Sequence, residues 1–437
     1  MKRPVIIALL GAALLLVCVG IGAVLILGAT PRLPANLPFL DERRVSAALE
    51  ESETLNVDAD EPLTLKVIDD AGAVTVVGAD VDTVQVDVVK TAYAPTQSRA
   101  DEEVQRIKYK IEQTGNAITI KYEVPNSIGI SNHFNTVDFV LTVPTNTIVN
   151  LDTNFGDVRV TDITGDTDIV NDFGEVQVEN VEGALSVSNN SGEISASAIE
   201  AGTQDIELQS DFGAISLTNA RGKDITLDSN SGTITLQDVR ATGDVHTNTD
   251  FGDTSFENGS SASLLVETNS GRVSLVKVRV SQEIKVQDDF GEIELDQALA
   301  NSYDLHTNSG SITVLGPKGK LKASTDFGGI KIEDAQDVTL DVETNSGTVE
   351  FSGSLGTGPH LVVSDFGEID LTLPADTKLN VDLSTDFGKI QSDLPITVTL
   401  NGTSNSDGDQ VVGSVNGGGD EFTARTNSGS VTIHAGK

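Results

Sequence analysis

Aspartate residues recur through most of the chain at a spacing that could bind cations. The regularly spaced ones are Asp172, Asp211, Asp250, Asp289, Asp326 and Asp365, and Asn190, Asn230, Asn269, Asn308 and Asn345 stand between them. A row of carboxylates could hold cations, although Ca²⁺ takes roughly six to eight oxygen ligands and no glycine-rich calcium-binding nonapeptide repeat is present in the sequence. The alternation with Asn favours a different role, because an Asn amide can donate a hydrogen bond to a neighbouring carboxylate. We expect a structural Asp/Asn ladder, and a row of cation sites stays open as the alternative.

Two consecutive triplets near the C-terminal end break this alternation and predict that Asp365 and Asp386 lie on adjacent levels. This pair is the candidate for a perturbed carboxylate pair or a metal site. The five histidines are not at metal-ligand spacing, and neither a nucleophile elbow nor a phosphate-binding loop is present in the sequence. We therefore predict no catalytic residues and no cofactor.

Phenylalanine alternates with serine at the next position of the same pattern. The phenylalanines are Phe173, Phe212, Phe251, Phe290, Phe327, Phe366 and Phe387. Phe212 has the same parity as Ile206 and Leu208, which predicts that this aromatic column faces the core. An exposed aromatic stripe that contacts sugar rings or a partner is the alternative interpretation.

Glycine ends each of these triplets and sets the period of the chain. The fourteen glycines are Gly156, Gly174, Gly192, Gly213, Gly232, Gly252, Gly271, Gly291, Gly310, Gly328, Gly347, Gly367, Gly388 and Gly429. Neighbours are 18 to 21 residues apart, except for a last step of 41. A fixed period of this size indicates stacked structural repeats, and we expect glycine because the turn needs φ above zero.

Each repeat consists of two short stretches of alternating apolar and polar residues around the glycine turn, as at 224–243. Period-two alternation predicts half-buried strands. The predicted fold is an all-β, single-chain, right-handed β-solenoid with about 20 residues per coil. The regular repeat covers 150–392 within a solenoid of 61–437, and 393–437 forms its C-terminal cap.

The N-terminal part predicts two helices. Residues 5–30 carry no charge, and a run of this length can cross a bilayer, so we expect 1–30 to be a cytoplasmic tip and signal anchor. The localisation that follows is a bacterial cell membrane protein, single-pass, with residues 31–60 as a linker and the body outside the cytoplasm. Val104, Ile107 and Ile111 predict one amphipathic helix over 98–112 that covers the open end of the solenoid.

The formal net charge of -38 excludes nucleic acid as a partner, because phosphates require Lys and Arg. The single cysteine excludes a disulfide framework. Repetitive layers of Val, Ile and Leu need few large rings, in keeping with an aromatic content of 4%.

Several segments resemble a large bacterial family of putative adhesins. They are the C-terminal segment 414–437, the strand at 72–86, the segment 139–144 and the repeated units ending in Gly-x-Ile/Val. The resemblance covers roughly 60–437 and implies a β-solenoid at the bacterial surface without catalytic residues.

The function predicted from these observations is a membrane-anchored, non-catalytic adhesin, scaffold or spacer. Its expected partners are the membrane, through residues 5–30, and an envelope glycan or another surface protein. Two alternatives remain: an envelope sensor that binds an envelope component, and a β-helical enzyme that degrades polysaccharides.

Overall fold

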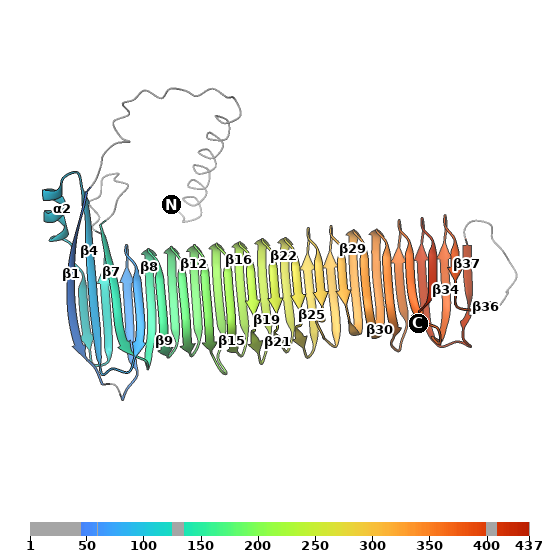
Figure 1. Ribbon diagram of the computed structural model, residues 1–437, viewed down its shortest axis with the longest axis horizontal. Helices are drawn as coiled ribbons and strands as arrows, with labels where there is room; N and C mark the ends of the chain where they lie inside the picture. Colours follow the sequence, from blue (N-terminus) through green and yellow to red (C-terminus); the bar gives the residue numbers. More distant parts are fainter. Residues whose placement is uncertain (1–44, 59, 125–134, 399–408, 437) are drawn as a thin grey trace, which may run out of the picture.

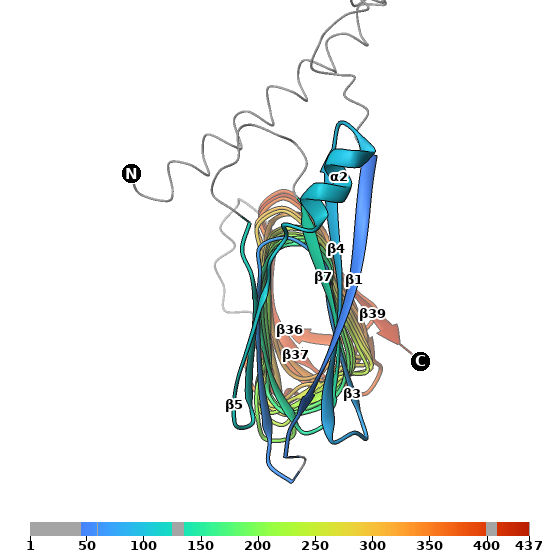
Figure 2. The same cartoon turned by 90° about the vertical axis from the view of Figure 1, so that its left-hand side faces the viewer.

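The computed structural model describes residues 45–58, 60–124, 135–398 and 409–436, and shows a rod of stacked coils (Figure 1). Seen down its long axis, each coil is a flattened oval with two long sides (Figure 2). Equivalent strands of neighbouring coils pair in parallel and in register, so that Ile206 lies between Leu185 and Ile225. The predicted right-handed β-solenoid is confirmed.

The first long side carries the strands that precede each glycine turn. In stacking order they are β6 (Ala117–Tyr122), β2 (Leu63–Asp69), β8 (Thr147–Phe155), β10 (Thr167–Phe173), β12 (Leu185–Ser191), β14 (Ile206–Phe212), β16 (Ile225–Ser231), β19 (Val245–Phe251), β22 (Leu264–Ser270), β25 (Glu283–Asp288), β27 (Ser302–Thr307), β29 (Lys318–Phe327), the second half of β30 (Ile330–Ser346), β32 (His360–Ser364), β38 (Asp420–Thr426) and β34 (Leu379–Thr385).

The second long side carries the strands that follow the turn. They are β7 (Thr136–Pro144), β3 (Val74–Ala79), β9 (Val158–Thr164), β11 (Val176–Glu182), β13 (Ile194–Glu200), β15 (Ile215–Gly222), β17 (Ile234–Gln237) with β18 (Arg240–Ala241), β20 (Thr254–Glu257) with β21 (Ser260–Ser261), β23 (Val273–Val276) with β24 (Arg279–Val280), β26 (Ile293–Asp296), β28 (Ile312–Leu315), the first half of β30, β31 (Val349–Leu355), β33 (Ile369–Pro374), β39 (Val431–Gly436) and β35 (Ile390–Ser392).

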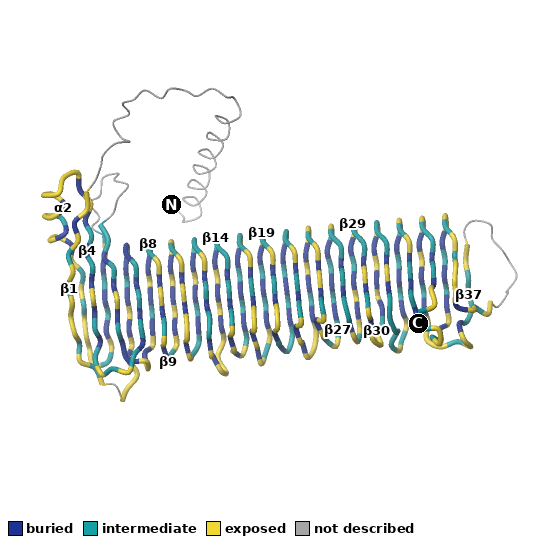
Figure 3. The backbone as a smooth tube through the Cα atoms, in the orientation of Figure 1, coloured by how far each residue is buried: buried dark blue, intermediate teal, exposed yellow. Residues whose placement is uncertain are grey.

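The core is a continuous apolar column between the two sides (Figure 3). In β14, Ile206 and Leu208 are buried while Glu207 and Gln209 are exposed. Because side chains alternate across a strand, the coils place most of their Val, Ile and Leu inward and most of their charges outward. Burial of these apolar side chains is the main stabilising contribution.

Glycine is required at the turn because the coils touch there through their backbones. A Cβ atom added to any column glycine would lie 1.7 to 2.2 Å from a carbonyl oxygen of the adjacent coil. In stacking order the column comprises Gly72, Gly156, Gly174, Gly192, Gly213, Gly232, Gly252, Gly271, Gly291, Gly310, Gly328, Gly347, Gly367, Gly429 and Gly388. Only five of these fifteen have φ between +20° and +160°, so the expectation that positive φ demands the glycine is wrong for most turns.

Both ends of the rod depart from chain order. The last coil, β38 and β39, lies between β32–β33 and β34–β35, so the C-terminal strands are inserted one coil inside the end. Antiparallel strands then close the stack: β36 (Ile396–Val398) and β37 (Asp409–Val415) at one end, and β1 (Val45–Asn56), β4 (Thr83–Ala94) and β5 (Lys110–Thr114) at the other. β1 occupies residues that were expected to be part of the linker.

The amphipathic helix is shorter than predicted. Helix α2 covers Gln97–Val104 and packs on β1 and β4, whereas Ile111 lies in β5. The alternation of Lys108, Lys110 and Glu112 with apolar residues suits an antiparallel pairing with β6, and that pairing displaces the second half of the predicted helix. Ile107 is buried without being helical.

The membrane-spanning helix is a further correction. Over the described part of the chain, no helix has the length and apolar character that a bilayer crossing requires, because the apolar residues there alternate along strands. The predicted membrane-spanning helix, and the single-pass membrane localisation that rested on it, are therefore wrong by this finding. The apolar run at 5–30 on which they rested lies outside the described residues.

Substitution Gly232→Ala tests the backbone contact. The new methyl group would lie 2.0 Å from the Gly213 carbonyl oxygen, so we expect the free energy of unfolding to fall by at least ~2 kcal/mol. Gly329→Ala is the control, because the nearest atom to its added Cβ is 3.3 Å away. Urea unfolding measures both, and equal losses would contradict the role of close approach.

Candidate functional site

The Asp and Asn side chains of the turn form a column beside the glycines. Asn230 donates to Asp211 at 3.2 Å, Asn308 to Asp289 at 2.8 Å, and Asn345 to Asp326 at 2.8 Å. Each amide donates to the carboxylate of the preceding coil. Such a contact satisfies the carboxylate while it separates like charges by two strand spacings, roughly 9.6 Å.

The alternation continues through both ends of the rod, although the order of the triplets along the chain breaks it there. Asn154 follows Asp70 in the stack and donates to it at 2.9 Å. At the other end, Asn427 of the inserted coil donates to Asp365 at 3.3 Å, and its carbonyl accepts from the backbone N–H of Phe387.

The expectation that Asp365 and Asp386 lie on adjacent levels is therefore wrong, because the Asn427 coil separates them. Within the described ranges no group of three or more His, Cys, Asp or Glu side chains comes together as a metal site. The other predicted ladder residues, Asp172, Asn190, Asp250 and Asn269, occupy the same turn position in their own coils.

Inward-facing hydroxyls support the turn from the core side. Thr249 donates to the Gly232 carbonyl at 3.2 Å, and Thr344 donates to Gly328 at 2.9 Å. Both threonines are buried, and Thr325, Ser364 and Thr426 make the same contact in their coils, whereas the buried Thr268 hydroxyl has no partner. These hydroxyls satisfy glycine carbonyls that face the dry interior.

Two coils carry an aspartate at this hydroxyl position. Asp288 lies between Thr268 and Thr307, and Asp69 precedes the first column glycine in the same way. One oxygen of each accepts a backbone N–H two residues on, while the other is buried without a partner. Burial raises the pKa of Asp288 to about 6 and that of Asp69 to about 7.

The phenylalanines point outward, and the prediction that they fill the core is wrong. Phe212, Phe251, Phe290, Phe327 and Phe366 are 59 to 66% exposed, and Phe387 is 84% exposed. The cross-strand register skips Asp211, where the backbone bends. The alternation that buries Ser210 therefore does not extend to Phe212. We call these six residues the Phe stripe.

The Phe stripe has a regular spacing. Phe212 lies over Ser231, and Ser231 lies over Phe251, so rings recur on every second coil, roughly 9.6 Å apart. Where two coils in succession carry Phe, the Phe155 and Phe173 rings stack at 5.0 Å. Each ring of the stripe is preceded by an Asp. The stripe is thus a row of aromatic faces that alternate with Ser and are flanked by carboxylates.

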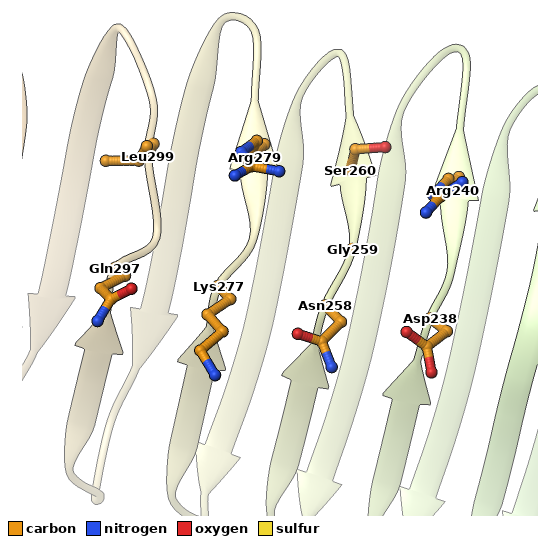
Figure 4. A pocket seen from close by; sticks show the side chains of 9 residues that line it. All are labelled: Asp238, Arg240, Asn258, Gly259, Ser260, Lys277, Arg279, Gln297 and Leu299. Atoms are coloured by element: carbon orange, nitrogen blue, oxygen red, sulfur yellow. The ribbon is translucent and has the colours of Figure 1, made fainter.

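A second surface was not predicted from the sequence. It is an open groove of about 640 Å³ across four coils, near the turn opposite the glycine column (Figure 4). We call it the basic groove; it is lined by Asp238, Arg240, Asn258, Gly259, Ser260, Lys277, Arg279, Gln297 and Leu299.

A left-handed bend forms the groove. Asp238, Asn258, Lys277 and Gln297 all have φ between 52° and 56°, and this conformation bends the second side of each coil. Most other coils have Asn or Asp at the bend, the types that tolerate left-handed backbone best. A recurring Asn or Asp two residues beyond the second member of an apolar pair was the signal available in the sequence.

Comparisons with known proteins bear on this fold. A family model described as Toastrack DUF4097 matches residues 73–318 and 260–434. A search of curated proteins finds no match.

Three solved structures are also similar. A putative adhesin from Bacteroides fragilis is 12% identical, with 65% of this chain and 97% of that one covered and a TM-score of 0.29. A putative adhesin from Parabacteroides distasonis is 16% identical, with 63% and 97% covered and a TM-score of 0.33. A putative cell adhesion protein from Clostridium sporogenes is 8% identical, with 89% and 100% covered and a TM-score of 0.16.

Substitution Asn345→Asp tests the ladder by placing a third carboxylate between Asp326 and Asp365. Like charges one strand spacing apart repel, so we expect a loss of about 1–2 kcal/mol in the free energy of unfolding. Added salt should recover part of it. Asn345→Ser, which removes the amide without adding charge, is the control. A loss that is equal in both variants and insensitive to salt would contradict charge separation as the reason for the alternation.

Substitution Asp288→Thr tests the buried carboxyl. Its pKa rises from 3.8 to about 6 on folding, so between these values the folded chain holds more protons and stability falls as pH rises. At pH 7 to 8 we expect the free energy of unfolding of the variant to exceed that of the wild type by about 1–3 kcal/mol. The gain should shrink as pH falls toward 4. Thermal unfolding across this range measures it, and a pH-independent gain would argue against the carboxyl as the cause.

Proposed function

Since the chain belongs to the Toastrack DUF4097 family and folds as a β-solenoid, we propose that it is a non-catalytic, adhesin-like rod that binds a linear partner along its length. The observation that carries the proposal is the Phe stripe. Six large rings lie on one edge of the rod, each more than half exposed. Folding gives no reason to expose these rings, since the coils with Ser at the same position stack equally well.

The chemistry of the stripe favours a linear glycan that carries free amino groups. Aromatic faces bind sugar rings by stacking, and cations are attracted both to the ring face and to the Asp that precedes each Phe. A ring on every second coil gives a repeat of roughly 9.6 Å, which suits an extended glycan with contacts at every second sugar. The net charge of -38 disfavours an acidic polymer on this edge. The adhesin names of the similar solved structures agree with a binding role.

Binding along a stripe makes a specific demand on the length of the ligand. Each further disaccharide should reach one more ring, so affinity should rise stepwise from chitosan disaccharide to tetrasaccharide to hexasaccharide. An exposed cation–π contact contributes about 0.5–1 kcal/mol. A partner that contacts only one coil would show no such dependence on length.

The test is a variant with Phe212, Phe251, Phe290 and Phe327 all changed to Ser, the residue of the intervening coils. The changed side chains are exposed, so we expect the circular dichroism spectrum and the unfolding midpoint to stay near those of the wild type. Affinity for chitosan hexasaccharide, measured by calorimetry, should fall at least tenfold.

The control for this variant removes exposed apolar side chains away from the stripe. Val170 and Val412 are 44% and 52% exposed, and Val170→Ser with Val412→Ser should leave binding unchanged. Unaltered binding by the Phe variant, or cleavage of the glycan by the wild type, would refute the proposed function.

A further inference from the structure

The basic groove gathers three cations that have no carboxylate partner. Arg221 pairs with Glu200 at 2.9 Å and Arg272 with Glu292 at 2.6 Å, as is common on so acidic a surface. Arg240, Lys277 and Arg279 make no ion pair with any other described residue, although all three are exposed. Unpaired guanidinium groups that line one hollow are donors available to an anion.

The cations are placed by the register of the coils. Arg240 lies over Ser260, and Ser260 lies over Arg279, so the two guanidinium positions are two strand spacings apart, roughly 9.6 Å. Lys277 lies on the same coil as Arg279, two residues before it. Figure 4 shows these side chains in two rows along the groove, with Asn258 and Ser260 on the coil between the charged ones. The result is cation, neutral donor, cation along the rod axis.

Lys277 occupies a backbone conformation that suits it poorly. Its φ is 54°; at the same bend the two preceding coils have Asp238 and Asn258, and the next coil has Gln297. A side chain other than Gly, Asn or Asp in this region costs roughly 1 kcal/mol. The bend therefore does not select lysine for stability, and the Ala198 and Gln297 bends show that it needs no charge, so the lysine adds a cation that folding does not require.

We propose that the basic groove binds an acidic glycan in which a carboxylate-bearing sugar alternates with a neutral one. Arg240 binds one carboxylate of the glycan. The next carboxylate is bound two coils farther along the rod by Lys277 together with Arg279. Asn258 and Ser260 bind hydroxyl groups of the neutral sugar between them, and Leu299 offers an apolar contact at the end of the groove. The groove, at about 640 Å³, holds a short oligosaccharide segment.

Charges around the groove limit the ligand to this class. Asp238 is the one carboxylate in the lining, so the lining carries three cations and one anion. Acidic groups farther away than roughly 8 Å are largely screened at physiological salt, but a uniformly and densely charged polymer would lie against them along the rod. A glycan with a charge on every second sugar places its carboxylates on the cations and its neutral sugars on the coil between them. This site is separate from the Phe stripe and does not depend on the proposed function.

The chain itself supplies conservative substitutions for the test. Arg240→Ser, Lys277→Asn and Arg279→Ser give these coils the residues of the intervening coil, Ser260 and Asn258. The triple variant should fold as stably as the wild type or more so, since Asn relieves the strain at residue 277. We expect its affinity for hyaluronan hexasaccharide to fall at least tenfold by calorimetry.

A variant of opposite sign strengthens the test. Asp238→Asn keeps a residue suited to the left-handed bend and removes the one repulsive charge, so we expect it to bind hyaluronan hexasaccharide about two- to fivefold more tightly. Binding by the wild type should weaken as salt rises. The quadruple Phe→Ser variant should bind this ligand like the wild type, which separates failure of the groove from failure of the stripe.

Three results would overturn the proposal. One is the absence of hyaluronan binding by the wild type, and another is equal affinity of the wild type and the triple variant. The third is an affinity for neutral chitin hexasaccharide or for inorganic phosphate that equals the affinity for hyaluronan hexasaccharide. Equal binding of chitin would show that the charge of the ligand is irrelevant, and equal binding of phosphate would show that its sugars are irrelevant.

Discussion

The rest of the structure depends on the contact between the backbones of neighbouring coils at the glycine turn. Each column glycine lies so close to the carbonyl of its neighbour that a Cβ atom cannot be accommodated, and this closeness fixes the axial position of every coil. With the turns aligned, the strands on both sides pair in register, and their apolar faces merge into one core. Buried Ser and Thr hydroxyls then satisfy the glycine carbonyls from inside.

Registry at the turn also explains the surface chemistry. A residue placed beside a column glycine recurs along the rod at one strand spacing, so a charge repeated on every coil would repel itself. The Asp/Asn alternation avoids this, and from Asp172 to Asp365 the Phe/Ser alternation follows it. The same registry operates at the opposite turn, where single substitutions in a few coils collect three cations into the basic groove. A solenoid thus converts periodicity in the sequence into rows of side chains, and local departures from the period into discrete sites.

The two ends show how strictly the alternation is kept. In chain order Asp365 and Asp386 belong to successive triplets, yet the C-terminal coil with Asn427 is inserted between them. At the other end Asp70 precedes Asn154 in the stack, although about eighty residues separate them in sequence. The inserted coil also protects the C-terminal strands, because a strand between two others has no free edge.

The repeat, the inward parity of residues such as Ile206 and Leu208, the solenoid, and the alternation of Asp with Asn could all be predicted from the amino-acid sequence, because they follow from a period of about 20 residues and from local side-chain alternation. The sequence pattern misplaced Phe212, because the backbone bend at Asp211 breaks the parity that predicts its burial. It also extended the helix beyond Val104 into a segment that pairs with a strand. Which coils are neighbours at the ends could be learned only from the folded chain, in which the inserted coil keeps Asp365 and Asp386 apart. The fold also brings Arg240, Lys277 and Arg279 to one groove, since residues a coil or two apart in sequence become adjacent only through the lateral pairing of strands.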